Sequence, residues 1–209
     1  MSSVTTTAPE PATRMSSEAR RGSILEAAAA VFGERGYVGA TTDAVAKAAG
    51  VSQPYVVRMF GTKENLFLEV LGRSLERLLT TFRRVIAEAP AGTDAVELKG
   101  LIALAYADLL QDRGLLLSLM QGFMLGADPA IGPAARAGFL QVYRLVRDEA
   151  GFSPEMAGEF LSGGMMLNTL VAIGLPAEYD TDPVAHELLD QCAPNKAAMI
   201  AKLSKKQLA

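Results

Sequence analysis

Four neighbouring side chains carry groups that recognise nucleic-acid bases. Gln53 can pair with adenine through two hydrogen bonds, and Arg58 can pair with guanine or bind a phosphate. Tyr55 and Pro54 can contact a thymine methyl group or the DNA backbone. These residue types, clustered within six positions of the chain, indicate noncovalent reading of base edges.

Residues on either side of this cluster suit the phosphate backbone. Thr41 and Thr42 supply hydroxyl groups, and Lys63 supplies an ammonium group. Ser52 stands at the start of an expected helix, and the free backbone N–H groups of a helix N-terminus bind the same anion. We therefore expect contacts with double-stranded DNA from Thr41, Thr42, Ser52, Gln53, Pro54, Tyr55, Arg58 and Lys63.

The residue types most used in catalysis and metal binding are scarce. Cys192 is the only cysteine and His186 the only histidine among 209 residues. A Cys/His zinc site, a Ser-His-Asp triad and a disulfide framework therefore lack their components, and the sequence has no glycine-rich phosphate loop. We expect no metal, no cofactor and no enzymatic activity. The lone thiol and the lack of a targeting segment favour the cytoplasm.

Two short helices joined by a glycine turn must position the cluster. Thr41 can cap a helix that runs to about Ala49, and Gly50 can adopt the positive φ of the turn. Ser52 followed by Pro54 opens the next helix. Residues 55–60 could also form a strand, because β-branched and aromatic residues dominate them. The Ser-x-Pro start and the lack of a partner strand favour a helix, which would enter the major groove.

The rest of the chain predicts further helices. One helix is expected from Ser17 to about Arg35, where Gly36 stops it, and can pack across the two short helices. An apolar stripe from Phe67 to Val85 predicts a long helix after Lys63. Further helices are expected over 93–112, 115–125, 128–150 and 153–175, and after 182 and 194. The expected fold is all-α, with about nine helices in two packed parts.

The chain divides into three parts by composition. Residues 1–17 are rich in Ser, Thr, Ala and Pro and are expected to be a disordered N-terminal arm. Residues 18–64 hold the helix-turn-helix, and residues 65–209 hold the remaining helices. The longest charge-free stretch, 160–177, contains Gly, Pro, Ser and Asn, so no membrane partner is expected.

Charge is distributed unevenly along the chain. The formal net charge is −3. Residues 14–84 carry 11 Lys and Arg against 7 Asp and Glu, a net charge of +4, whereas residues 85–209 carry 9 against 15, a net charge of −6. Such asymmetry is typical of a chain with one end that meets phosphates. Ordinary scatter of surface charge would explain it equally well.

The run from Arg21 to Val70 closely resembles the N-terminal domain of the TetR (tetracycline repressor-like) family of bacterial transcription regulators, over about a quarter of the chain. The matching residues are Ile24, Ala27, Ala28, Phe32, Gly36, Tyr37, Thr41, Thr42, Val45, Ala46, Ala49, Gly50, Val51, Ser52, Phe60, Lys63, Glu64 and Leu66. The resemblance implies a three-helix DNA-binding domain joined by a long helix to a C-terminal ligand-binding and dimerisation domain.

The same resemblance implies roles for individual residues. Gln53, Pro54, Tyr55 and Arg58 would form the recognition helix, and Thr41 and Lys63 would contact phosphates. Two positions depart from the family pattern. Val57 and Met59 stand where family members usually carry Tyr and His, both of which often bind backbone phosphate, so these two contacts are lost and Arg58 is the candidate substitute.

An apolar set rich in methionine marks a candidate ligand site in the C-terminal part. Methionine and aromatic side chains suit adaptable pockets, and a few polar groups can orient a ligand. We expect ligand contacts from Tyr106, Leu117, Met120, Gln121, Met124, Phe139, Tyr143, Met166 and Asn168. The alternative for each of them is plain core packing.

Small residues on the helix over 153–175 allow another helix to approach closely. This favours dimerisation through this helix and the one after Asp182; the alternative is packing within one subunit. Together these features predict a homodimeric regulator, most simply a repressor that an apolar small-molecule effector releases from a palindromic operator. The alternative function is a helical carrier for a hydrophobic small molecule.

Overall fold

The computed structural model describes residues 16–110, 112–194, 197, 198, 200 and 201, and within them the chain folds into helices and connecting turns. The α-helices are α1 Ser17–Gly39, α2 Thr42–Ala48, α3 Gln53–Phe60, α4 Lys63–Glu88, α5 Ala95–Leu109, α6 Arg113–Met124, α7 Ile131–Arg144, α8 Pro154–Ala172 and α9 Pro183–Cys192. A π-helical segment, Leu145–Glu149, continues α7, and a short 3-10 helix, Leu175–Glu178, follows α8. The all-α prediction with nine helices is confirmed for the described residues.

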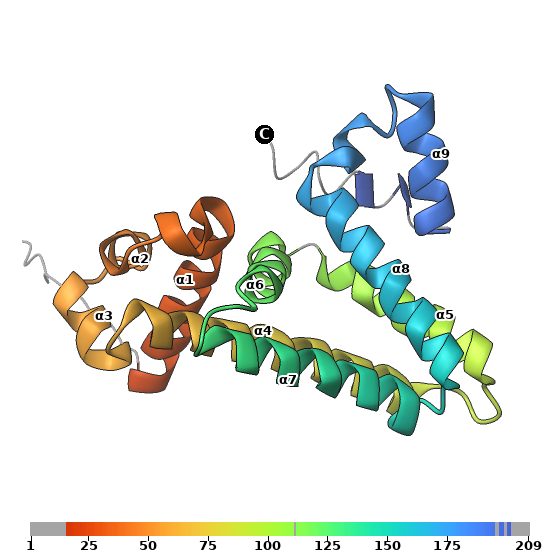
Figure 1. Cartoon of the computed structure of the whole chain (residues 1–209), viewed down its shortest axis with the longest axis horizontal. Coiled ribbons are helices and arrows are strands. Elements are labelled where there is room, and N and C mark those ends of the chain that lie inside the picture. The colour runs from red at the N-terminus through yellow and green to blue at the C-terminus, as the bar shows by residue number, and fades with distance from the viewer. Residues whose placement is uncertain (1–15, 111, 195–196, 199, 202–209) are drawn as a thin grey trace, which may run out of the picture.

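Helices α1, α2 and α3 form the N-terminal unit (Figure 1). Thr41 caps α2 by accepting a hydrogen bond from the backbone N–H of Ala44 at 3.1 Å. Gly50 has φ 65°, a conformation that favours glycine, and turns the chain into α3. Val56 and Phe60 are buried, so α3 packs its apolar side inward. Residues 55–60 are thus helical, and the strand alternative is wrong.

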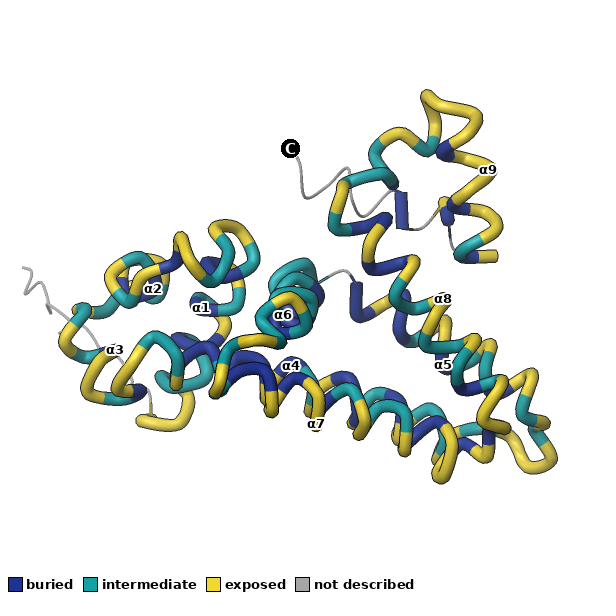
Figure 2. The backbone as a smooth tube through the Cα atoms, in the orientation of Figure 1, coloured by how far each residue is buried: buried dark blue, intermediate teal, exposed yellow. Residues whose placement is uncertain are grey.

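Helix α4 connects this unit to the remaining helices. Thr62 caps it through a 3.1 Å hydrogen bond from the backbone N–H of Asn65. The helix runs alongside α7 and passes α6 on its way to α5 and α8 (Figure 1). Its buried side carries the apolar stripe that the sequence predicted, including Phe67, Leu71 and Phe82. Figure 2 shows buried positions along the sides of α4, α5 and α8 that face other helices.

Several element boundaries differ from the sequence-based expectation. Gly36 breaks α1 as expected, because its φ of 72° and ψ of 164° are not helical, but a further helical turn continues to Gly39. Gly114 lies between the helices expected over 93–112 and 115–125. In the structure Asp112 caps α6, so Gly114 belongs to the first turn of that helix. A Cβ at Gly114 would come within 3.2 Å of the Ala29 backbone, and this close approach of α6 to α1 is why a glycine stands there.

Two expectations fall largely outside the described residues. Residues 1–15 of the arm expected over 1–17 lie outside the described residues. Ser16 caps α1, and Ser17 is the first residue of that helix. The helix expected after Pro194 is described at 197, 198, 200 and 201. No helix in the described part of the chain combines the length and the hydropathy that crossing a membrane requires.

Candidate nucleic-acid interface and ligand cavity

The N-terminal end of α3 presents polar side chains to the surface. The hydroxyl of Ser52 precedes the helix without making a capping hydrogen bond, and Ser52, Pro54 and Arg58 are exposed. Tyr55 is half-buried, and the guanidinium of Arg58 lies 5.1 Å from the centroid of its ring. This cation–π contact holds Arg58 beside Tyr55, so that both side chains face the same outer side of the helix.

Gln53 is held in place by the preceding helix. Its Nε2 donates a hydrogen bond to the Oγ1 of Thr42 at 3.2 Å, and both residues are half-buried. The contact restricts the rotamers of Gln53 and leaves its amide oxygen and second amide hydrogen for other partners. Thr42 therefore acts on Gln53, while Thr41 serves as the cap of α2.

Lys63 is bound to the end of α1. Its Nζ donates a 2.9 Å hydrogen bond to the carbonyl oxygen of Tyr37 and lies 4.6 Å from the centroid of the Tyr37 ring. The ammonium group thus caps a helix C-terminus, where the dipole favours a cation. Lys63 links α1 to α4 in this structure, a role that the sequence did not indicate.

The two positions that depart from the family pattern have different surroundings. Val57 is exposed on α3, whereas Met59 is half-buried. The carbonyl oxygen of Met59 accepts a 3.4 Å hydrogen bond from Arg21, and Arg21 also pairs with Glu69 and lies over the Phe60 ring. Arg21 therefore joins α1, α3 and α4 internally.

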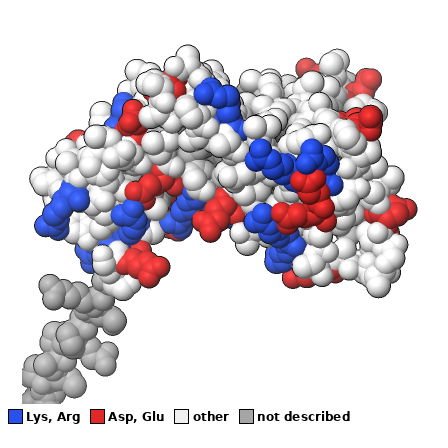
Figure 3. Space-filling view, turned by 60° about the horizontal axis from the view of Figure 1, so that its bottom comes forward, with Lys and Arg blue, Asp and Glu red and all other residues white. Residues whose placement is uncertain are grey.

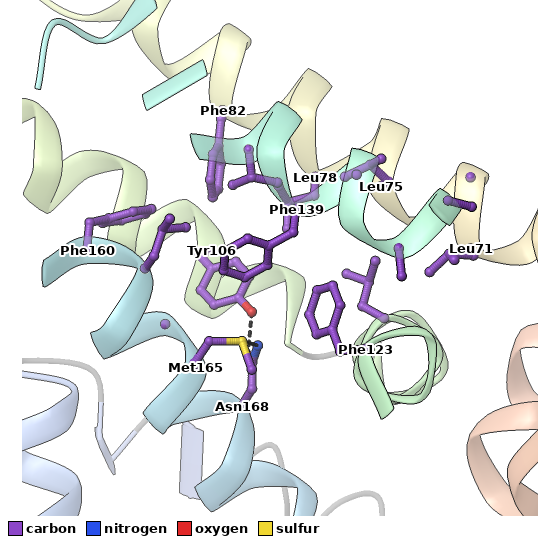
Figure 4. Close-up of a pocket in the computed structure, with 18 of the residues that line it drawn as sticks. Leu71, Leu75, Leu78, Phe82, Tyr106, Phe123, Phe139, Phe160, Met165 and Asn168 are labelled. Carbon is purple, nitrogen blue, oxygen red and sulfur yellow. Dashed lines mark hydrogen bonds between the residues drawn. The ribbon is translucent and has the colours of Figure 1, made fainter. Parts of the chain in front are cut away.

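A cavity of about 130 Å³ lies among α4, α5, α6, α7 and α8 (Figure 4). Its walls are almost entirely aliphatic and aromatic. The lining residues are Leu68, Leu71, Gly72, Leu75, Leu78, Phe82, Tyr106, Leu119, Phe123, Ala134, Ala135, Gly138, Phe139, Val142, Phe160, Leu161, Gly164, Met165 and Asn168. Edge-on contacts join Phe82 to Tyr106 and Phe160, and Phe123 to Phe139.

Tyr106 and Asn168 form a buried polar pair in this wall. The tyrosine hydroxyl donates a hydrogen bond to the Oδ1 of Asn168, and the side-chain amide nitrogen has a 3.9 Å contact with the sulfur of Met165. Burial raises the pKa of Tyr106 well above its ordinary value, because the phenolate would be poorly solvated there. The hydroxyl therefore stays protonated at neutral pH.

Three of the nine predicted ligand residues line this cavity, namely Tyr106, Phe139 and Asn168. The other six lie elsewhere: Leu117, Met120, Gln121, Met124, Tyr143 and Met166. Leu117 packs beside Gly33 of α1, and Gln121 donates a 2.5 Å hydrogen bond to the carbonyl oxygen of Phe32. Met124 is 82% exposed and Met166 is 49% exposed, and neither lines the cavity.

The sequence reasoning overlooked the contribution of α4 to the cavity. Leu71, Leu75, Leu78 and Phe82 belong to the apolar stripe by which the helix was predicted, and all four line the cavity. The apolar stripe could have indicated this contribution, because a long amphipathic helix packs against several helices along its buried side.

Two helices, α4 and α6, connect the cavity to the N-terminal unit. Helix α4 follows α3 directly and lines the cavity further along, while α6 places Leu119 and Phe123 in the cavity wall and Gln121 against α1.

Arginines on the exposed side of α4 join it to its neighbours through the pairs Arg73–Glu26, Arg77–Asp112 and Arg83–Glu149. Hydrogen bonds from Arg83 lower the pKa of Glu149. Exposed pairs of this kind are individually weak.

Basic and acidic side chains alternate over the face that Figure 3 presents. On α2, Lys47 pairs with Asp43 at 2.9 Å, which offsets its charge. Arg58 is exposed on α3, and helix N-termini such as those of α2 and α4 also favour anions.

Residues 24–70 match the profile of the family described as bacterial regulatory proteins, tetR family. The transcriptional activator FasR of Mycolicibacterium smegmatis is 40% identical to the chain over 73 residues, which is 35% of this chain and 33% of FasR. The chain therefore matches about a third of the length of this curated relative.

Two solved structures have the same fold along most of their length. A transcriptional regulator from Rhodococcus sp. Rha1 superposes with a TM-score of 0.63 at 23% identity, over 87% of this chain and 96% of that one. The ketosteroid transcriptional regulator KstR2 of Mycobacterium tuberculosis gives a TM-score of 0.59 at 18% identity, over 88% of this chain and 93% of that one. At these identities the similarity concerns the fold.

Proposed function

We propose that this chain is a transcriptional regulator of the TetR family of bacterial regulatory proteins. It binds a palindromic DNA operator as a homodimer and releases the operator when a small apolar effector binds. The observation that carries DNA binding is the outer side of α3, where Arg58 lies over the Tyr55 ring, together with the Ser52 hydroxyl at the start of the helix, which makes no capping hydrogen bond. Gln53, oriented by Thr42, supplies the bidentate group that reads adenine.

Two copies of α3 are needed to read a palindrome. The copies must lie about 34–36 Å apart to enter successive major grooves on one side of the duplex. An exposed apolar stripe supports dimerisation through the other end of the molecule. It consists of Met166 on α8, Ile173 at the C-cap of α8, and Val184 and Leu188 on α9. Ser162 and Gly163 extend the stripe on α8 and leave room for a partner helix.

Effector release depends on α4 and α6, the helices that connect the cavity to the N-terminal unit. A ligand that enters the cavity contacts α4 through Leu71 to Phe82, and a tilt of α4 changes the position of α3 at its N-terminal end. The same ligand contacts α6, whose Gln121 is bonded to α1. A coupling free energy of about 1–3 kcal/mol between the two sites gives a response of about 5- to 150-fold in operator affinity.

We propose repression as the sign of regulation, because a dimer seated across an operator excludes other proteins from that DNA. The name of FasR describes an activator, so the sign needs its own test. A reporter gene placed behind the selected operator should give less product when the protein is present. Increased product would identify the chain as an activator.

Selection of a randomised duplex library by the purified protein tests DNA binding. Retained sequences should contain a palindrome with half-sites about one or two helical turns apart. Retention without a preferred sequence, or no retention, together with tight binding of apolar molecules, would identify the chain as a carrier.

Variants of α3 assign the reading of bases. Gln53→Ala should cost about 1–3 kcal/mol of discrimination at one base pair of each half-site, and Arg58→Ala should do the same or reduce the salt dependence of binding if it contacts phosphate. Arg84→Ala is the matched control, since it removes the same charge from the far end of α4. Titration at two salt concentrations separates these cases, and equal behaviour of all three variants would remove α3 from the interface.

Lys63→Ala is expected to weaken binding to all DNA sequences alike, because Lys63 holds the end of α1 against α4 and lies beside the phosphate-facing helix ends. Thermal unfolding of the variant measures how much of the loss is structural. A change of sequence preference in this variant would contradict the assignment.

A further inference from the structure

The cavity excludes charged ligands. None of the described side chains that line it is ionised at neutral pH, since its polar members are the Tyr106 hydroxyl and the Asn168 amide. A carboxylate or an ammonium group that entered would lose its hydration without gaining a countercharge, which costs far more than a buried hydrogen bond returns. The effector must therefore be neutral in the part that occupies the cavity.

The polar pair leaves a hydrogen-bond donor for the ligand. Tyr106 is 8% exposed and Asn168 is 5% exposed, and the hydroxyl of Tyr106 uses its single hydrogen on the Oδ1 of Asn168. The Nδ2 of Asn168 has two hydrogens, and its partner is the weakly accepting sulfur of Met165 at 3.9 Å. Figure 4 shows the hydroxyl, the amide and the sulfur together in the cavity wall. A buried N–H group with so weak a partner favours an acceptor atom on the ligand.

The size of the cavity limits the part of the ligand held inside it to about one ring. Its volume of about 130 Å³ is close to that of an engineered apolar cavity of about 150 Å³ that takes up benzene. The rings of Phe82, Phe139 and Phe160 come from three different helices and offer edges and faces to a flat guest.

We propose that the effector is a small neutral molecule with a single aromatic ring or a similarly compact apolar body, and that it carries one acceptor oxygen, such as a ketone or ester carbonyl, which accepts a hydrogen bond from the Nδ2 of Asn168. Asn168 is thereby the residue that determines specificity, and Tyr106 is the positioning residue that fixes the orientation of its amide. This proposal rests on the proposed function in taking the cavity as the effector site.

Three probes of nearly equal shape separate the features of this ligand. Acetophenone carries the carbonyl acceptor, α-methylstyrene replaces its oxygen with a methylene group, and benzoate carries a negative charge. Titration calorimetry on the full chain without DNA should show acetophenone binding about 2- to 10-fold more tightly than α-methylstyrene, as expected for one neutral hydrogen bond. Benzoate should bind about 100-fold more weakly or not at all.

Substitutions then locate the donor. Asn168→Leu should make acetophenone and α-methylstyrene bind equally, whereas Met165→Leu, the matched control in the same wall, should keep the preference. Tyr106→Phe should reduce the preference without abolishing it, because the amide hydrogens remain but the bond that orients the amide is lost. Gly164→Leu, which adds a side chain starting 3.7 Å from the Tyr106 ring, should abolish binding of all probes.

Several outcomes would overturn the proposal. Equal binding of acetophenone and α-methylstyrene to the unmodified chain, tight binding of benzoate, or no binding of any probe at its solubility limit would each contradict the ligand class. Loss of the preference in Tyr106→Phe but not in Asn168→Leu would make the hydroxyl the donor. Operator binding is measured separately: a chain that binds acetophenone as described but never binds DNA would overturn the proposed function and leave the ligand class intact.

Discussion

At the scale of single residues, the Tyr106–Asn168 pair shows how an apolar wall tolerates polar groups. Each of these side chains would be costly to bury alone, and their hydrogen bond removes much of that cost. The pair also makes the protonation of Tyr106 part of the folding equilibrium, because burial raises its pKa above the ordinary value of 10.0.

The raised pKa predicts a loss of stability at high pH. The unfolded chain releases the Tyr106 proton near pH 10, whereas the folded chain retains it, so the contribution of the group is complete below about pH 10 and is lost as pH rises through the folded pKa. Urea unfolding should show a free energy of unfolding that falls by up to about 1.4 kcal/mol per pH unit from this group. Tyr106→Phe should have a flatter profile; an identical slope in both proteins would contradict the burial of a protonated hydroxyl.

Lys63 and Gln53 show the effect of protein partners at the same scale. Both were predicted from residue type to contact DNA, yet in the structure each already has a protein partner, Tyr37 for Lys63 and Thr42 for Gln53. These partners restrict the side chains before DNA arrives. DNA contact by either residue stays a prediction, now with a defined starting geometry.

At the scale of elements, α6 is the helix whose position the sequence specified least. It is apolar around most of its circumference, and its three sides meet α1, α4 and the cavity. Glycines allow this packing: Gly114 lies against the Ala29 backbone, and a Cβ at Gly122 would come within 2.8 Å of the Leu71 side chain. Backbone atoms cannot move aside as a flexible side chain does, so Gly114 is the stricter requirement.

Matched glycine substitutions test this contact. Gly114→Ala should destabilise the protein by about 1–3 kcal/mol, because the added methyl group would push α6 away from α1. Gly100→Ala, at an exposed position of α5 with open space around it, should stabilise the protein by about 0.5–1 kcal/mol through helix propensity. Thermal unfolding of the two variants compares them directly, and a stabilising Gly114→Ala would refute the close approach.

At the scale of the whole molecule, the candidate DNA-reading helix α3 precedes α4, and the cavity lies along the middle of α4, from Leu68 to Phe82. The N-terminal unit lies at one end, the α5 and α8 helices lie at the other, and α9 lies beyond them (Figure 1). The exposed apolar stripe on α8 and α9 is therefore remote from α3, so two subunits could join there and leave both copies of α3 free for DNA.

Charged substitutions in this stripe should dissociate the proposed dimer. The side chains of Ile173 and Val184 are 68% and 72% exposed, respectively, in the monomer. The substitutions Ile173→Glu and Val184→Glu replace them with carboxylates. Analytical ultracentrifugation should give the 22.1 kDa monomer mass for the double variant, with loss of binding to the palindromic operator. Val96→Glu on α5, at 68% exposure, is the matched control and should remain dimeric. A dimeric double variant would place the interface elsewhere.

Local signals in the sequence were enough to predict the helix-turn-helix and most of the helical order. The cap at Thr41, the positive φ of Gly50 and the apolar spacing of α4 act over a few residues and need no distant partner. The residues on the outer side of α3 could be predicted for the same reason, because the spacing of the buried Val56 and Phe60 leaves them on the opposite side of a short helix.

The lining of the cavity and the contacts that brace the helices depend on tertiary packing. The cavity wall comes from five successive helices, with lining residues spread from Leu68 to Asn168. The sequence of an apolar helix such as α6 does not show which of its sides faces a cavity and which faces α1. Gln121 consequently bonds to Phe32, while Phe123, two residues along, reaches the cavity. The direction of a side chain on such a helix is set by long-range packing, which one sequence does not encode locally.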